Sequence, residues 1–316
     1  MRVISISIIF IAAVLKLSAQ VEYPYPTHYL HLIIENKPLQ MAYMDVTSNK
    51  SNGKTIILFH GKNFNGYYWK NVIPMLTEKG YRVIAPDQIG WGKSDRPDLH
   101  YSFQMLAENN KALLDSLHIE KVTVLGHSMG GMLAVRFALM FPNITEKLIL
   151  EDPIGLEDYK TFVPYKSLEE LYQKEKSATY ESYKKYQQGY YPEWKPEYEQ
   201  YVQAQAQDLQ SKNFDAIAWN NALTYQLIYT QPVVYELKYL KMPTLLIVGS
   251  VDRTIVGKNY LSDSIKNQHG NYPALAQRAK EQMPNCKLII IPGVGHIPHA
   301  QEPEKFREAV MNFLSE

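Results

Sequence analysis

The stretch VTVLGHSMGGMLAVRFALMFP, residues Val122–Pro142, carries the clearest indication of fold class in this 316-residue chain. Its first residues form a short apolar run that is typical of a buried β-strand, and the residues after Met129 form a longer apolar run that is typical of a buried helix. Between the two runs lies GHSMG, a G-x-S-x-G sequence over residues 126–130. A strand that enters this pattern and a helix that leaves it predict a tight turn that presents Ser128 as a nucleophile.

A similar alternation of strands and helices runs through most of the chain. Short β-branched runs without polar alternation predict strands that are buried on both faces, and helix-like patterns lie between them. The predicted strands are residues 55–60, 82–87, 122–127, 147–152, 244–250 and 287–293, and the predicted helices include residues 67–79, 102–117, 129–141 and 302–314. Residues 28–35 and 40–46 alternate more and predict antiparallel strands at one edge. We therefore expect an α/β fold with a mostly parallel central sheet flanked by helices.

Residues 154–241 interrupt this alternation. They contain many of the 24 tyrosines of the chain and lack a strand-like apolar run, which predicts a helical cap with turns over residues 189–196. The tyrosine rings and Trp194 could line a pocket of mixed polarity, or they could only pack the cap against the sheet domain. The expected organisation is a core formed by residues 21–153 and 242–316, with residues 154–241 as the cap.

The N-terminus has the features of an export signal. Arg2 precedes an apolar run over residues 3–15, and Ser18 and Ala19 are small residues suited to cleavage. The run is short for a bilayer span, so we predict a signal peptide over residues 1–20 and an extracytoplasmic protein, periplasmic or secreted. An uncleaved N-terminal membrane anchor is the alternative.

Charge and cysteine content exclude several classes of function. The 33 lysines and arginines nearly balance the 32 aspartates and glutamates, so no strong field would attract nucleic acid. Cys286 is the single cysteine, which rules out an internal disulfide and a cysteine-based metal site. The sequence does not indicate the oligomeric state.

A nucleophilic serine needs a base and an acid that orients the base. His296 follows the last predicted strand and precedes the last predicted helix, and Asp252 follows the strand before it. These positions give the chain order Ser, Asp, His. Asp152, at the end of another predicted strand, is the alternative acid. His299 is interpreted as a surface residue or as a residue behind the catalytic groups, and no metal site is expected there.

The negative oxygen formed during acyl transfer needs two hydrogen-bond donors. The backbone amide of Met129, directly after the nucleophile, is the first candidate. The segment HGKNF follows an early strand and offers the backbone amide of Lys62, with that of Asn63 as the near alternative. Gly61 would allow the backbone to approach closely, and the Lys62 side chain is expected to be solvated.

The motifs HGKNF, APDQIGWGKSDRP, GHSMGG, LLIVGSVDRTIV and GVGHIPHAQEPEKF occur in this order. Through them the chain resembles serine hydrolases of the α/β-hydrolase fold with a helical cap, from about residue 28 to the C-terminus. The resemblance implies a Ser-His-Asp triad, an acyl-enzyme, and neither cofactor nor metal. Relatives that open epoxides or remove halides carry an aspartate where this chain has Ser128, so those reactions are disfavoured.

The expected function is hydrolysis of a carboxylic ester or a related acyl bond of a small molecule. C–C bond, lactone or amide hydrolysis and cofactor-free perhydrolase chemistry of the same fold stay open, because this fold hosts many reactions. A receptor of this fold that binds a small molecule is a further alternative, and only measured turnover separates it from an enzyme.

Overall fold

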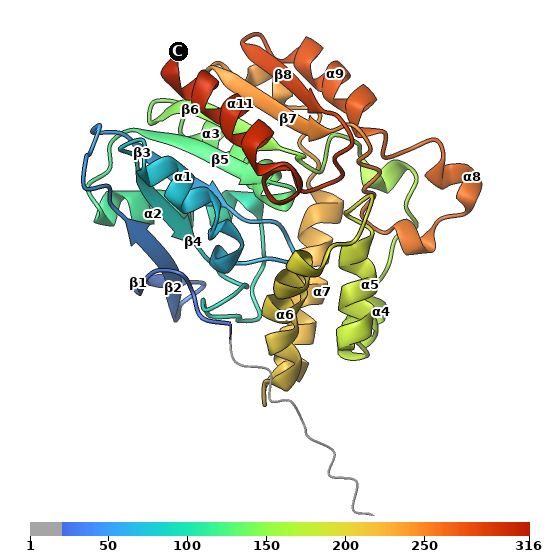
Figure 1. Cartoon of the computed structure of the whole chain (residues 1–316). Coiled ribbons are helices and arrows are strands. Elements are labelled where there is room, and N and C mark those ends of the chain that lie inside the picture. The colour runs from blue at the N-terminus through green and yellow to red at the C-terminus, as the bar shows by residue number, and fades with distance from the viewer. Residues whose placement is uncertain (1–20) are drawn as a thin grey trace, which may run out of the picture.

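The computed structural model describes residues 21–316, so the predicted signal peptide lies outside the described residues. An eight-stranded sheet with the order β1-β2-β4-β3-β5-β6-β7-β8 forms the centre of the molecule (Figure 1). Its strands are β1 (Thr27–Ile34), β2 (Lys37–Val46), β3 (Thr55–Phe59), β4 (Arg82–Pro86), β5 (Val122–His127), β6 (Thr145–Glu151), β7 (Thr244–Gly249) and β8 (Cys286–Ile291).

The direction of the strands follows the two patterns seen in the sequence. Strand β1 pairs with β2, and β2 with β4, in antiparallel fashion. All other neighbours, from β4 through to β8, pair in parallel. Parallel strands covered by helices bury both of their faces, which explains why β5 and β7 are buried at every position. The prediction of a mostly parallel sheet with an antiparallel edge is therefore confirmed.

Helices cover both faces of the sheet and create two apolar cores. One core contains side chains of α2 (Phe103–Ser116), α3 (Met129–Met140) and α9 (Tyr272–Gln282). The other contains side chains of α1 (Val72–Thr77) and α11 (Pro303–Ser315), which lie on the same face of the sheet in Figure 1. Alternate residues of each strand feed the two cores, because successive side chains of a strand point to opposite faces.

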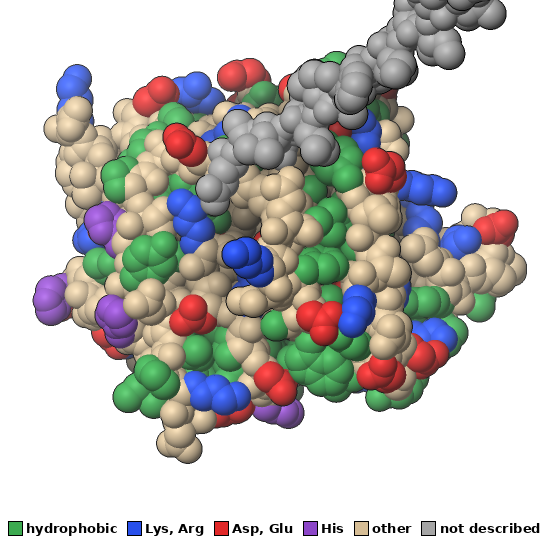
Figure 2. Space-filling view, turned by 90° about the horizontal axis from the view of Figure 1, so that it is seen from below, with side chains coloured by type: hydrophobic (Ala, Val, Ile, Leu, Met, Phe, Trp, Pro, Cys, Tyr) green, Lys and Arg blue, Asp and Glu red, His purple; other side chains and the backbone are tan. Residues whose placement is uncertain are grey.

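The chain between β6 and β7 forms four main helices that gather at one end of the sheet (Figure 1). They are α4 (Leu168–Lys176), α5 (Tyr180–Gln188), α6 (Glu199–Ala206) and α7 (Phe214–Thr230). Ser167 and Thr179 begin α4 and α5 through capping boxes, in which the side chain accepts a hydrogen bond from the third helical residue. Figure 2 shows acidic and basic side chains interspersed on the face seen from below, in keeping with the net charge of +1.

One predicted helix differs from the structure, and some observed helices have no predicted counterpart. The helix expected over residues 67–79 is divided into a 3-10 turn, Gly66–Trp69, and the short helix α1. The Asn65 side chain caps the first turn by accepting the Tyr67 amide at 3.1 Å, and α1 starts two residues before Pro74, as expected for proline in a first helical turn. Helices α8 (Asp263–Lys266) and α9 follow β7 and were not predicted. No helix within residues 21–316 is long and apolar enough to cross a membrane.

Candidate active site

Ser128 occupies the turn between β5 and α3 in a strained backbone conformation. Its φ of 56° is in a region that non-glycine residues rarely adopt. Side chains larger than hydrogen would clash at both flanking glycines. A Cβ at Gly126 would lie 2.1 Å from the carbonyl oxygen of Gly130, and a Cβ at Gly130 would lie 2.0 Å from the carbonyl oxygen of Phe59. The turn therefore depends on glycine at both positions, and it holds the Ser128 side chain at the carboxyl end of the central strand.

The structure brings three of the predicted site residues into one chain of hydrogen bonds. The Nε2 atom of His296 lies 2.9 Å from Ser128 Oγ, and its Nδ1 atom lies 2.7 Å from Asp252 Oδ2. The other carboxyl oxygen of Asp252 accepts the backbone amide of Thr254 at 2.8 Å. Because Nδ1 faces a carboxylate it carries the proton, which leaves Nε2 free to accept the serine proton. All three side chains are buried.

Of the two candidate acids, Asp252 is the one that contacts His296. Burial acts to raise the pKa of Asp252, but the charge and hydrogen bond of His296, with further hydrogen bonds from Asp152 and Thr254, outweigh it and lower that pKa. Asp152 lies behind Asp252, where both of its oxygens accept the Gly249 amide, at 3.2 and 3.1 Å. Burial and the neighbouring Asp252 raise the pKa of Asp152 well above its ordinary value.

The predicted donors for a negative oxygen lie on either side of Ser128. Met129 is the first residue of α3, so its backbone amide has no acceptor within the helix. It also lies at the N-terminal end of the helix, where the helix dipole has its positive end. A Cβ at Gly61 would lie 3.2 Å from Ser128 Cβ, so the segment containing Lys62 runs beside the serine. The carbonyl of Lys62 accepts a 2.7 Å hydrogen bond from Trp91 Nε1, which fixes the orientation of this loop.

The Lys62 side chain is not simply solvated, contrary to the prediction. It is half-buried, and burial lowers its pKa although the charge of Glu175, on α4 of the cap, partly opposes the shift. The sequence could not show this environment, because Glu175 belongs to a helix far away in the chain. A partly desolvated cation therefore lies on the loop beside the candidate nucleophile.

Tyr190, in the loop after α5, joins the cap to both sides of the site. Its carbonyl oxygen accepts the backbone amide of His296 at 2.8 Å, and its hydroxyl accepts the side-chain amide of Asn63 at 2.9 Å. The centroids of the Tyr190 and His296 rings are 5.0 Å apart. Sequence reasoning did not single out Tyr190, since nothing local distinguishes it from the other tyrosines of the cap. Trp194, by contrast, packs within the cap against Tyr191 and Tyr198.

Two further histidines support the loop that carries His296. His127 Nε2 donates a 2.8 Å hydrogen bond to the carbonyl oxygen of His296. Burial, followed by the neighbouring imidazoles of His296 and His299, lowers the pKa of His127 well below its usual value, so it stays neutral. His299 is 2% exposed, so the interpretation as a surface residue is wrong. Its Nδ1 atom lies 2.9 Å from both oxygens of Glu151 at the end of β6.

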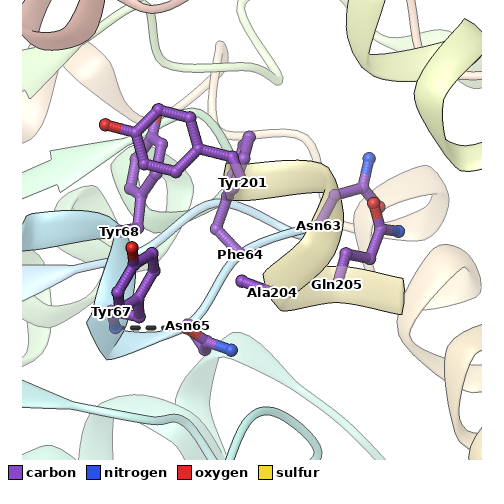
Figure 3. Close-up of a pocket in the computed structure, with 8 residues that line it drawn as sticks. All are labelled: Asn63, Phe64, Asn65, Tyr67, Tyr68, Tyr201, Ala204 and Gln205. Atoms are coloured by element: carbon purple, nitrogen blue, oxygen red, sulfur yellow. Dashed lines mark hydrogen bonds between the residues drawn. The ribbon is translucent and has the colours of Figure 1, made fainter. Parts of the chain in front are cut away.

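A small cavity lies next to the loop that follows β3. Figure 3 shows Phe64, Tyr67 and Tyr68 of that loop opposite Tyr201, Ala204 and Gln205 of α6, with Asn63 and Asn65 completing the wall. Its volume of about 10 Å³ matches a single water-sized sphere. The cavity is therefore too small for a substrate. Ser128 itself is 6% exposed.

Within residues 21–316, one group of side chains has the spacing of metal ligands. It consists of Asp152, Asp252 and His296, whose ligand atoms lie within 4.8 Å of one another. These same groups already form the hydrogen bonds of the candidate triad and of the carboxyl pair behind it. The cluster is therefore part of the arrangement around Ser128 and offers no separate set of ligands.

Comparison with known proteins identifies the family to which this fold belongs. The α/β-hydrolase fold family matches residues 54–303, and the chain is a member of that family. A crystal structure of a "probable hydrolytic enzyme" from Pseudomonas aeruginosa superposes with a TM-score of 0.91 at 46% identity, and the match covers 93% of this chain and 95% of that one. The enol-lactonase of Burkholderia xenovorans, at 19% identity and a TM-score of 0.70, shares the fold and covers 91% of this chain and 100% of that one.

The curated relatives differ in how much of their length the match covers. An uncharacterized protein of Mycobacterium bovis is 42% identical over 105 residues, which are 33% of this chain and only 30% of that relative. A haloalkane dehalogenase of Mycolicibacterium paratuberculosis is 32% identical over 41% of this chain and 43% of its own length. A 2-hydroxy-6-oxononadienedioate/2-hydroxy-6-oxononatrienedioate hydrolase of Paraburkholderia phymatum is 27% identical, with 91% of this chain and 95% of that relative aligned.

Proposed function

We propose that this chain is a serine hydrolase that cleaves a carboxylic ester or related acyl bond of a small molecule. The observation that carries the proposal is the continuous hydrogen-bond chain from Ser128 Oγ through both nitrogens of His296 to Asp252. A nucleophile, a base and an orienting acid at these distances are the arrangement that acyl transfer requires. Membership of the α/β-hydrolase family supports the same class of reaction.

In the proposed first half-reaction, Ser128 Oγ attacks the substrate carbonyl carbon while its proton moves to Nε2 of His296. The resulting negative oxygen accepts hydrogen bonds from the backbone amides of Met129 and Lys62. When the intermediate collapses, the bond from carbon to the leaving oxygen breaks, and His296 returns the proton to that oxygen. The products of this half are a free alcohol and an acyl group on Ser128.

Water completes the cycle in the second half-reaction. His296 Nε2 removes a proton from water as the oxygen attacks the acyl carbon, and the same two amides stabilise the second negative oxygen. The bond to Ser128 then breaks and Ser128 recovers its proton. Asp252 stays ionised throughout and stabilises the protonated imidazole, in keeping with its lowered pKa.

The experiment that tests this proposal measures hydrolysis of p-nitrophenyl esters of increasing acyl length by the purified wild-type chain and by Ser128→Ala. We expect turnover in the wild type and a loss of about 10⁴-fold or more in the variant. The preferred acyl length would report on the space beneath the cap, which we propose selects the substrate. A folded wild-type chain that hydrolyses none of the esters would favour a receptor of this fold.

A second candidate reaction is hydrolysis of a C–C bond in a dioate substrate. The relative from Paraburkholderia phymatum, named for that kind of substrate, aligns with 91% of this chain. The half-buried Lys62 ammonium group would suit a substrate carboxylate, because partial desolvation strengthens an ion pair. Lys62→Met should then raise the KM for a 2-hydroxy-6-oxo dioate and leave the KM for a neutral ester nearly unchanged. Equal effects on both substrates would count against this reaction.

We also propose that residues 1–20 are an export signal and that the enzyme acts outside the cytoplasm. The apolar run behind Arg2 and the small residues Ser18 and Ala19 support this location. N-terminal sequencing of the chain recovered from an expressing cell should find a start near Gln20. An intact Met1 on a membrane-associated chain would favour the anchor instead.

A further inference from the structure

Asp152 is a fully buried carboxyl group with no role in the proposed mechanism. It directly follows β6 and adopts a φ of 36°, a strained value for a residue with a side chain. Its backbone amide donates a 2.8 Å hydrogen bond to the carbonyl oxygen of Ile247 on β7. Its two carboxyl oxygens accept the amide of Gly249, also on β7. The chain thus holds this carboxyl group in one place at the cost of backbone strain.

The place that Asp152 occupies is beside Asp252 and His296. One oxygen of each carboxyl group and one nitrogen of the imidazole lie within 4.8 Å of one another. Asp252 already accepts hydrogen bonds from His296 Nδ1–H at 2.7 Å and from the Thr254 backbone amide at 2.8 Å. Two carboxylates in contact in a buried site cannot both ionise, so one of the pair retains a proton. Asp252 has the donors that favour the ionised form, which leaves the proton on Asp152.

We propose that Asp152 is a positioning residue whose protonated carboxyl group donates a hydrogen bond to Asp252, and that it can take over as the acceptor for His296 when Asp252 is removed. The proposal rests on the proposed serine hydrolase function. In the wild type Asp152 holds the orienting carboxylate in place. In an enzyme without Asp252, the Asp152 carboxyl group releases its proton to solvent and the resulting carboxylate accepts a hydrogen bond from Nδ1–H of His296.

Charges on the surrounding elements agree with a neutral Asp152. Burial, then the charge of Asp252 and the hydrogen bond to it, and then the charge of Glu151 on β6 all raise the pKa of Asp152. Two tyrosines also face the pair, Tyr159 before α4 and Tyr272 on α9, and burial raises the pKa of both, so they stay neutral. The guanidinium group of Arg253 binds the backbone carbonyl of Asp252 and not its carboxylate.

Removing Asp252 eliminates the nearest negative charge, so ionisation of Asp152 becomes easier but still has to overcome burial. If the variant without Asp252 depends on ionised Asp152, its hydrolytic activity must increase with pH. This increase must continue over a pH range in which the activity of the wild type is already constant. A residue that only supported the fold would not create this new pH dependence. The pH profile thus distinguishes positioning by Asp152 from general structural support.

The experiment compares ester hydrolysis and fluorophosphonate labelling by wild type, Asp252→Ala, Asp152→Asn and the double variant, with Ser128→Ala as the inactive control. We expect Asp252→Ala to retain activity roughly 100-fold below wild type, where loss of a triad acid otherwise costs about 10⁴-fold. Its activity should increase with pH. The double variant should fall at least tenfold further and lose that increase. Thermal unfolding of each variant verifies the fold, and the isosteric Asp252→Asn replaces Asp252→Ala if the latter does not fold.

The possible outcomes separate this inference from the proposed function. An active wild type with equal residual activities for Asp252→Ala and the double variant at every pH would overturn the inference and leave the serine mechanism standing. A wild type that neither labels nor hydrolyses would overturn the proposed function itself. Asp152→Leu adds an independent check: it removes both the donor and the acceptor, so its kcat should fall below that of Asp152→Asn, which keeps a donor for Asp252.

Discussion

The carbonyl oxygen of Tyr190 accepts a 2.8 Å hydrogen bond from the backbone amide of His296. A residue of the cap therefore holds the loop that carries the proposed catalytic base. The approach is close enough that a Cβ at Gly295 would lie 2.2 Å from the same oxygen, so the loop needs glycine there. Since the Tyr190 hydroxyl also contacts Asn63 on the opposite loop, we expect the position of the cap to affect the geometry around Ser128.

Tyr190→Phe tests this coupling without removing the ring or the backbone contact. The change deletes the hydroxyl that accepts the Asn63 side chain, a hydrogen bond worth about 1 kcal/mol. We expect kcat/KM for an ester to fall roughly fivefold, with little change in thermal stability. Tyr239→Phe is the matched control, because Tyr239 is 61% exposed and lies outside the site. Equal kinetics for the two variants would show that the hydroxyl contact is unimportant.

Trp91→Phe tests the orientation of the loop that bears the Lys62 amide. The variant loses the 2.7 Å hydrogen bond from the indole to the Lys62 carbonyl oxygen. The peptide between Lys62 and Asn63 then loses a constraint, which loosens the adjoining peptide that carries the Lys62 N–H, so we expect kcat to fall roughly tenfold with a smaller change in KM. Trp219→Phe also removes an indole hydrogen bond, at 3.1 Å to Asp98, but away from the site. The prediction fails if Trp91→Phe changes kcat no more than Trp219→Phe does.

Gly130→Ala tests the steric reason for the turn at Ser128. The new methyl group would lie 2.0 Å from the backbone carbonyl of Phe59, which cannot move without disturbing β3. We expect a loss of about 3 kcal/mol or more in the free energy of unfolding, measured in urea. Gly53→Ala, at a φ of 76° but with open space around it, should lose about 1 kcal/mol from backbone strain alone. Similar losses in the two variants would contradict this explanation.

Asp152→Asn tests the protonation state of the buried carboxyl pair through stability. The native protein keeps the Asp152 proton, whereas the unfolded chain releases it above the ordinary pKa of 3.8. The native state thus binds more protons, and wild-type stability falls as pH rises above that value, until the raised native pKa is reached. Asparagine has no such proton. Relative to wild type, the variant should gain up to about 1.4 kcal/mol per pH unit above about pH 4. Parallel stability curves in urea titrations would mean that Asp152 is ionised in the native protein.

The sequence predicted those parts of the fold that depend on local pattern. Buried parallel strands leave continuous apolar runs, and each run was recognised within one or two residues of the observed strand, as for β5 and β7. The turn at Ser128 was equally visible, because the glycines required by its close contacts stand beside it in the chain. The residues Asp252 and His296 could be placed because loops after parallel strands meet at one edge of a sheet.

Contacts between distant segments could not be predicted from one sequence. Tyr190 contacts His296 and Asn63 from a loop whose path depends on how the cap packs. It is one of 24 tyrosines in the chain, and its side chain does not distinguish it from the others. The charge of Glu175 on α4 likewise acts on Lys62 from a distant part of the chain. Asp152 was recognised as an alternative acid. The sequence could not reveal that Asp152 lies beside Asp252, so that both candidate acids belong to one site.

The site of covalent labelling by a fluorophosphonate probe tests most directly whether Ser128 is a nucleophile activated by His296. The purified chain is treated with the probe, digested, and analysed by mass spectrometry, in parallel with Ser128→Ala and His296→Ala. We expect a phosphonylated peptide modified at Ser128 in the wild type, no label in Ser128→Ala, and labelling slowed by several orders of magnitude in His296→Ala. Label on another residue, or equal labelling rates for wild type and His296→Ala, would contradict Ser128 as a nucleophile activated by His296.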